Sequence, residues 1–189
     1  AYSVDGIQGV GIDPTAAKFR RYYPDGVMVV PDFFSARVYR SVQSRPAKII
    51  TSIAMLYDLE SPIDFARDVA DVLAKDGVWH FEQSYMPSML RMTSYDTICH
   101  EHLEYYSLGS IRRILDAADL QIVDVITNGI NGGSFAVTAT HKANTTIRPN
   151  CAVIDWLLQQ EDRMGLSTPR PFRDFEERVF RHRQDLVRL

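Results

Sequence analysis

The sequence lacks the features that mark several classes of protein. Its two cysteines, Cys99 and Cys151, cannot supply a four-ligand zinc site by themselves, and they require no oxidising compartment. No apolar run approaches the roughly 18–20 residues of a membrane span, and the N-terminus has no basic region followed by an apolar one. The 21 basic and 24 acidic residues give a net charge of −3 without a basic block. We therefore expect a cytoplasmic protein with no membrane or nucleic-acid partner.

What the sequence contains is the composition of a globular domain, with 46% hydrophobic and 24% charged residues. Short β-rich runs alternate with helical periodicity, which is typical of an α/β sheet with crossover helices. The run at residues 47–54 is apolar enough for a strand buried on both faces, so we expect it at the centre of the sheet. The expected strands are Ile7–Ile12, Val27–Val30, Ala47–Ala54, Val78–Gln83, Leu120–Ile126 and Ser134–Thr140.

Helical signals separate these strands. Ser61 and Pro62 supply an N-cap and a first-turn proline to a helix that we expect to end at Gly77. Helical patterns are also found over Thr15–Tyr23 and from Ser107 onward. The stretch between residues 84 and 106 has no clean periodicity, which predicts a loop with short helical turns. A long irregular segment in a compact domain usually serves function.

The last two expected strands are joined by an Asn- and Gly-rich connection that is too short for a parallel crossover, which needs about a dozen residues. The sheet should therefore end in an antiparallel hairpin. After His141 the sequence becomes helical, over Cys151–Met164 and Pro171–Leu189. We expect a core domain at residues 1–145 and a helical extension or linker at residues 146–189.

Acidic residues follow two of the expected strands. Asp13 ends the first strand, at the position where α/β nucleotide-binding folds place a carboxylate that accepts hydrogen bonds from ribose hydroxyls. A carboxylate that only caps the next helix would occupy the same position. Asp32 follows the second strand, where it could meet an adenine amino group while Phe33 or Phe34 covers the ring. The pair indicates a nucleotide-like ligand more strongly than either residue alone.

This arrangement resembles the class I S-adenosylmethionine-dependent methyltransferase fold, a Rossmann-like and mostly parallel sheet with a terminal antiparallel hairpin. The resemblance runs from Ile7 to about His141 and begins at the second strand of that fold. The sequence opens without Met, almost directly on a strand. We therefore expect a fragment or a processed chain whose first strand and glycine-rich turn lie upstream.

The resemblance implies S-adenosylmethionine as the cofactor and assigns residues to it. Asp13 would hold the ribose, and Asp32 and Phe33 would hold the adenine. Ser52 and Ala54 would lie at the rim beneath the methionine part.

Two further stretches are similar to one branch of that fold, the sugar C-methyltransferases. They are Phe81–Leu108 (FEQSYMPSMLRMTSYDTICHEHLEYYSL) and Asn131–Phe135 (NGGSF). The branch methylates a carbon beside a keto group of a nucleotide-linked deoxysugar, and its EH pair serves proton transfer. The resemblance assigns that pair to Glu101 and His102 and implies a small-molecule nucleotide-sugar substrate. The branch also has an N-terminal zinc module and a C-terminal domain, and we expect both to lie outside this sequence.

The segment YDTICHEHLEYYS is informative without any family, because it gathers eight Tyr, Asp, Glu and His side chains within thirteen residues. Carbon methylation needs a base that removes a proton next to a carbonyl, and histidine, with an ordinary pKa of about 6.5, suits this task. We expect His102 to be the base and Glu101 to orient it. His100, Tyr95 and Tyr57 should lie near the substrate.

Other interpretations of these residues remain open. The chain could be an O- or N-methyltransferase on a small molecule, or a non-catalytic remnant of the fold. The histidines could simply bond backbone carbonyls in a loop. A zinc-protease motif does not fit, because Glu104 stands where that motif needs its second histidine, so we expect no metal site here.

Overall fold

The computed structural model describes residues 6–189, which form two compact units divided between Pro46 and Ala47. The first unit holds a two-stranded parallel sheet of β1 (Gly9–Ile12) and β2 (Val27–Val30), in which Ile12 lies opposite Val30. Its helices are α1 (Ala16–Phe19), the 3-10 turn Arg20–Tyr22, and α2 (Ala36–Val42). Ser35 begins α2, because its hydroxyl accepts a hydrogen bond from the amide of Val38.

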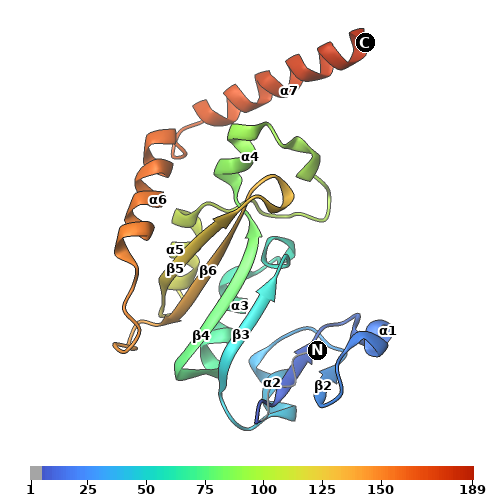
Figure 1. Ribbon diagram of the computed structural model, residues 1–189, viewed down its shortest axis with the longest axis vertical. Coiled ribbons are helices and arrows are strands. Elements are labelled where there is room, and N and C mark those ends of the chain that lie inside the picture. Colours follow the sequence, from blue (N-terminus) through green and yellow to red (C-terminus); the bar gives the residue numbers. More distant parts are fainter. Residues whose placement is uncertain (1–5) are drawn as a thin grey trace. The chain divides into compact units, whose positions relative to one another are not determined.

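The second unit is built on a four-stranded sheet in the order β3-β4-β6-β5 (Figure 1). Its strands are β3 (Ala47–Ile53), β4 (Leu73–Ser84), β5 (Leu120–Asn128) and β6 (Ser134–His141). β3 and β4 are parallel, whereas β6 is antiparallel to both β4 and β5. The predicted α/β class and the terminal antiparallel hairpin are confirmed.

Five helices accompany this sheet: α3 (Pro62–Val72), α4 (Met86–Met92), α5 (Leu108–Asp116), α6 (Cys151–Met164) and α7 (Arg170–Arg188). α5 packs against α3, α6 and β5, and the core contains the fully buried side chains of Trp79, Phe81, Phe135 and Ile111. α7 contacts α4 at the end of the sheet and then continues beyond it (Figure 1). The predicted C-terminal helices are confirmed.

Two predictions about β3 and α3 are wrong. β3 pairs only with β4 among the described residues, so it is an edge strand of its sheet, and Ile49 is 67% exposed. α3 ends at Val72 rather than at Gly77, because the chain turns into β4 at Leu73. Gly77 lies inside β4, where a Cβ would stand 2.8 Å from the carbonyl oxygen of Ala47. This glycine therefore permits close approach of two strands instead of ending a helix.

The contact pattern divides the chain after residue 46, and the predicted boundary between residues 145 and 146 stays a prediction. Within residues 6–189 we find no helix long and apolar enough to cross a membrane.

Candidate functional site

The segment that follows α4 is tied back to the turn after β3. Tyr57 lies in a 3-10 turn, Leu56–Asp58, and its carbonyl oxygen accepts hydrogen bonds from the amides of Leu103 (2.9 Å) and Glu104 (3.1 Å). These two bonds join residues that are more than forty positions apart in sequence. They place the titratable segment predicted from the sequence beside the carboxyl end of β3.

Two of the predicted catalytic residues are in direct contact. The ring centroids of Tyr57 and His102 are 4.3 Å apart, with an angle of 47° between the planes, and Tyr105 approaches His102 edge-on at 6.2 Å. Tyr57 is only 9% exposed. Burial raises the pKa of its hydroxyl, and negative charge on Asp58 and Cys99 raises it further. Tyr57 is therefore a neutral hydrogen-bond donor beside a half-buried imidazole.

Glu101 and His100 lie on the solvent side of this segment. Their closest polar atoms, His100 Nε2 and Glu101 Oε1, are 3.6 Å apart, and the side chains are 91% and 70% exposed. The carboxylate predicted to orient His102 thus has its ion-pair contact with the neighbouring histidine. An exposed pair of this kind holds its geometry weakly.

Asp58 is a carboxylate that the sequence reasoning missed. Burial raises the pKa of Asp58, the charge of His102 lowers it, and the charge of Glu101 raises it. Asp58 therefore lies within electrostatic reach of both members of the predicted pair. Its position directly after Tyr57 was the available signal, since both residues share one turn. We call Tyr57, Asp58, His100, Glu101 and His102 the open cluster.

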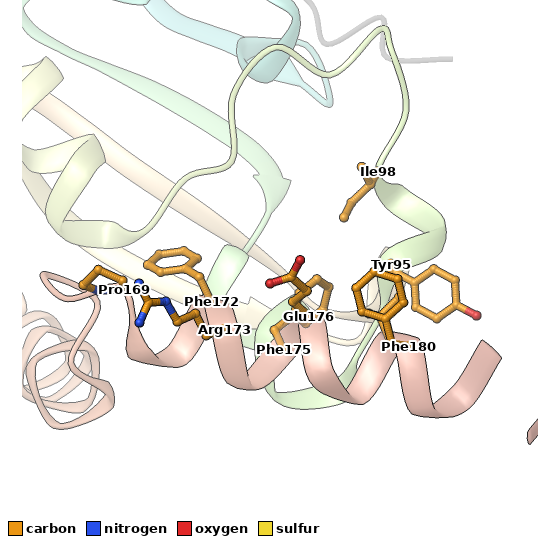
Figure 2. A pocket seen from close by; sticks show the side chains of 9 residues that line it. Tyr95, Ile98, Pro169, Phe172, Arg173, Phe175, Glu176 and Phe180 are labelled. Carbon is orange, nitrogen blue, oxygen red and sulfur yellow. The ribbon is translucent and has the colours of Figure 1, made fainter. Parts of the chain in front are cut away.

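Tyr95, also predicted to lie near the substrate, is bound to the last helix. Its hydroxyl and Nδ1 of His182 are 2.8 Å apart, and the two rings meet edge-on. Beside it lies a groove of about 630 Å³ between this segment and α7 (Figure 2). Aromatic side chains of α7, Phe172, Phe175 and Phe180, face Tyr95 and Ile98 across it.

The first unit holds three of the predicted cofactor residues at the carboxyl edge of its sheet. Oδ1 of Asp13 accepts hydrogen bonds from the amide and the hydroxyl of Thr15, both at 2.6 Å. Oδ1 of Asp32 accepts from the amide of Phe33 (2.7 Å), and the Phe33 ring is 75% exposed. Asp13 therefore holds the turn at Thr15 that precedes α1. Among residues 6–189, nothing donates a hydrogen bond to the second carboxylate oxygen of Asp13 or of Asp32.

Ser52 and Ala54 are found at the end of β3 in the second unit. The Ser52 hydroxyl accepts a hydrogen bond from Nε1 of Trp79 (2.9 Å), so this side chain is already engaged by the neighbouring strand. Ala54 has a φ of 53° and donates its amide to the carbonyl oxygen of Glu82 (2.8 Å). A left-handed alanine is uncommon, and here it marks the sharp turn that leads from β3 toward Tyr57.

A different set of residues packs tightly between the hairpin loop and α4. Gly133 has a φ of 123°, and a Cβ there would stand 2.5 Å from Cβ of Ser88; a Cβ on Gly132 would stand 2.9 Å from Oγ of Ser94. These glycines serve close packing.

Nearby, Glu161 of α6 is buried and accepts three hydrogen bonds. They come from the amides of Leu108 (2.6 Å) and Gly109 (2.9 Å) and from the hydroxyl of Tyr85 (2.8 Å). Its carboxylate therefore caps the N-terminus of α5 from another helix. We call Tyr85, Ser88, Gly132, Gly133 and Glu161 the packed junction.

Within the described residues, no group of three or more His, Cys, Asp or Glu side chains is placed to hold a metal ion.

Comparison with known proteins places this geometry in a family. A methyltransferase domain model matches residues 2–125, and a model of the C-methyltransferase C-terminal domain matches residues 129–189. At least part of the C-terminal domain that we expected outside the sequence is therefore matched within it. The C-methyltransferase NovU of Streptomyces niveus is 30% identical over 185 residues, which cover 95% of this chain and 43% of NovU. The chain thus spans less than half the length of this curated relative.

Solved structures share the fold at low sequence identity. The mitomycin 7-O-methyltransferase MmcR has a TM-score of 0.55 at 15% identity, covering 72% of this chain and 42% of that one. The O-methyltransferase NcsB1 of neocarzinostatin biosynthesis, solved with S-adenosylmethionine, has a TM-score of 0.52 at 19% identity, covering 71% and 42%. The predicted cofactor, S-adenosylmethionine, is confirmed for the family. The chain belongs to the methyltransferase domain family, of the class I S-adenosylmethionine-dependent fold, and resembles the C-methyltransferases.

Proposed function

We propose that the protein is an S-adenosylmethionine-dependent C-methyltransferase that acts on a nucleotide-linked keto-deoxysugar through an enolate. Two findings support carbon as the acceptor atom: the match to the C-methyltransferase C-terminal domain and the 30% identity to NovU. A cytoplasmic location and a role in sugar biosynthesis are part of the same proposal.

The observation that carries the proposal is the contact between His102 and Tyr57. A half-buried imidazole lies 4.3 Å from a buried phenol, with the carboxylate of Asp58 in electrostatic reach. Enolate formation needs a base to remove the proton, a neutral hydrogen-bond donor can stabilise the enolate oxygen, and a carboxylate can stabilise the protonated base. Their presence in one cluster is difficult to explain by packing alone.

Each group has a distinct role in the proposed reaction. His102 accepts the proton from the carbon beside the keto group, and the C–H electron pair moves into the enolate. The Tyr57 hydroxyl donates a hydrogen bond to the enolate oxygen. The enolate carbon then takes the methyl group that S-adenosylmethionine supplies when bound, as the S–CH₃ bond breaks and S-adenosylhomocysteine leaves. Asp58, with Glu101, stabilises the imidazolium.

The residues proposed for the methyl donor fit a nucleoside in part. Asp13 and Asp32 present carboxylates at one edge of the β1-β2 sheet, and the exposed Phe33 ring beside them offers a flat apolar surface. Such an edge suits ribose hydroxyls and a purine ring. At the end of β3, the Ser52 hydroxyl is engaged by Trp79, so Ala54 and its turn remain the better candidate for contact with the methionine part.

The experiment that tests the proposal uses the protein with ¹³C-methyl-labelled S-adenosylmethionine and a panel of nucleotide-linked keto-deoxysugars. Mass spectrometry detects transfer, and carbon NMR of the product identifies the methylated atom. We expect a new carbon–carbon bond beside the keto group. A methyl group on oxygen or nitrogen would instead establish the alternative methyltransferase class. Absence of transfer with every acceptor, together with absence of donor binding by calorimetry, would indicate a non-catalytic member of the fold.

A further inference from the structure

Side chains in the middle of α7 make hydrogen bonds to residues 90–95, which precede residues 100–102 of the open cluster in the sequence. Nε of Arg178 donates to Oγ1 of Thr93 (3.0 Å), and Nη2 donates to the carbonyl oxygen of Leu90 (2.5 Å). One helical turn later, Nδ1 of His182 shares a hydrogen bond with the hydroxyl of Tyr95. Most of α7 is exposed, but the two hydrogen bonds of Arg178 are partly buried.

Thr93 is the residue at which α4 ends, and its conformation explains why it needs a partner. Its φ is 56° and its ψ is 38°, in the left-handed region that glycine or asparagine normally occupies at a helix end. A β-branched side chain is disfavoured there. The Arg178 guanidinium bonds the threonine hydroxyl and, through its second nitrogen, one of the terminal carbonyl groups that α4 itself leaves without a helical partner.

The direction in which the chain leaves Thr93 determines where residues 100–102 of the open cluster lie. The following residues are held at intervals: Tyr95 by His182, then Thr97, whose carbonyl oxygen accepts from the hydroxyl of Tyr105 (3.3 Å). The far end is fixed by the hydrogen bonds that the backbone amides of Leu103 and Glu104 donate to the carbonyl oxygen of Tyr57. The segment is thus attached at both ends, and α7 supplies the first attachment.

We propose that Arg178 is a positioning residue for the site. By fixing the left-handed end of α4, it sets the course of residues 94–105 so that the His102 ring reaches Tyr57. The chemical role of His102 rests on the proposed function, whereas its position can be measured without any substrate. Failure of this inference and failure of the proposed function are therefore distinguishable.

The test compares the wild-type chain with Arg178→Met and Arg178→Lys by NMR. Amide hydrogen exchange reports the bonds of Leu103 and Glu104 to Tyr57, and the His102 ring signals report the ring current of the Tyr57 phenol. In Arg178→Met we expect exchange at both amides to accelerate about tenfold or more, because two charge-assisted bonds are lost. The His102 signals should move toward those of a solvent-exposed imidazole. Arg178→Lys should fall between the two, since one ammonium group cannot reproduce the two-pronged contact.

The matched control is Arg183→Met, which removes an exposed arginine side chain of α7 that makes no hydrogen bond or ion pair with the described residues. It should leave both measurements at their wild-type values. The inference is overturned if Arg178→Met leaves exchange and ring signals unchanged, or if Arg183→Met changes them equally. Thermal unfolding of each variant identifies global destabilisation; should Arg178→Met not fold, Arg178→Lys decides, and wild-type values in it overturn the inference.

Discussion

The packed junction and the open cluster lie in the same unit of the molecule, but they differ in how many internal contacts their side chains make. In the packed junction, Gly133 leaves no space for a side chain and Glu161 has a partner for both carboxylate oxygens. In the open cluster, His100 and Glu101 are exposed and meet only at 3.6 Å, while His102 rests on one face against Tyr57.

The difference separates residues that maintain the fold from residues that are available for chemistry. A buried carboxylate that accepts three hydrogen bonds satisfies buried donors, so removing it lowers the stability of the fold. An exposed or half-buried titratable group with few internal partners costs little to remove and can interact with a substrate. Variants in the packed junction should therefore change stability first, and variants in the open cluster should change chemistry first.

The largest stability loss should follow Gly133→Ala. The added Cβ would stand 2.5 Å from Cβ of Ser88 at a φ of 123°, so overpacking and backbone strain combine. We expect a loss of about 3–5 kcal/mol in the free energy of unfolding, measured by urea denaturation. Gly129→Ala is the matched control, because nothing lies within 4 Å of its Cβ position and its φ is −93°. Equal stability of the two variants would contradict the packing described for this loop.

A smaller loss should follow Glu161→Gln. The NH₂ group of the new side-chain amide would face one of the groups that now donate a hydrogen bond to the carboxylate, so that hydrogen bond would be lost. The negative charge at the N-terminus of α5 would be lost as well. We expect about 2–3 kcal/mol in the free energy of unfolding. Asp162→Asn, at the exposed neighbouring position, should change stability by less than about 0.5 kcal/mol. If Glu161→Gln were as stable as Asp162→Asn, the buried carboxylate would not be the cap that we describe.

The smallest stability effect, and the most informative one for the cluster, should follow His102→Gln. Positive charge on His102 lowers the pKa of the Asp58 carboxyl, which burial raises. Without the imidazole, the pKa of Asp58 should rise further, because burial then acts with less opposition. NMR titration of the Asp58 carboxyl carbon measures this change. His100→Gln serves as the control, since His100 pairs with Glu101. A larger rise of the Asp58 pKa in this control than in His102→Gln would contradict the interaction between Asp58 and His102.

Sequence reasoning located the local elements well because their signals are local. The hydroxyl of Ser107 caps α5 as its sequence predicts, and α6 begins and ends at the predicted residues. Pairing is less accessible. The composition of β3 indicated a strand with neighbours on both sides, but composition does not specify which strands are present to pair with it. Gly77 was interpreted as a helix end, since a glycine that permits strand contact has the same local signature.

For the site, the sequence identified the right segment but not the contacts inside it. His102 and Tyr57 were predicted separately, and the fold brings their rings together across 45 positions. Glu101 was assigned to His102 through the resemblance to the EH pair of the sugar C-methyltransferases. The structure shows its ion-pair contact with His100 instead and adds Asp58 from another turn. The hydrogen bonds of Arg178 to Thr93 and of His182 to Tyr95 had no sequence signal, since they join residues more than 80 positions apart.

The proposed function depends on His102 removing the proton from the carbon beside the keto group. This step is tested by solvent deuterium exchange at that carbon, followed by NMR in the presence of a nucleotide-linked keto-deoxysugar, the proposed substrate. We expect exchange in the wild-type protein and a fall of about 10²–10⁴-fold in His102→Gln, with substrate binding retained, which is the usual contribution of a general base. Exchange at the wild-type rate in His102→Gln would show that His102 is not the base and that another residue removes the proton.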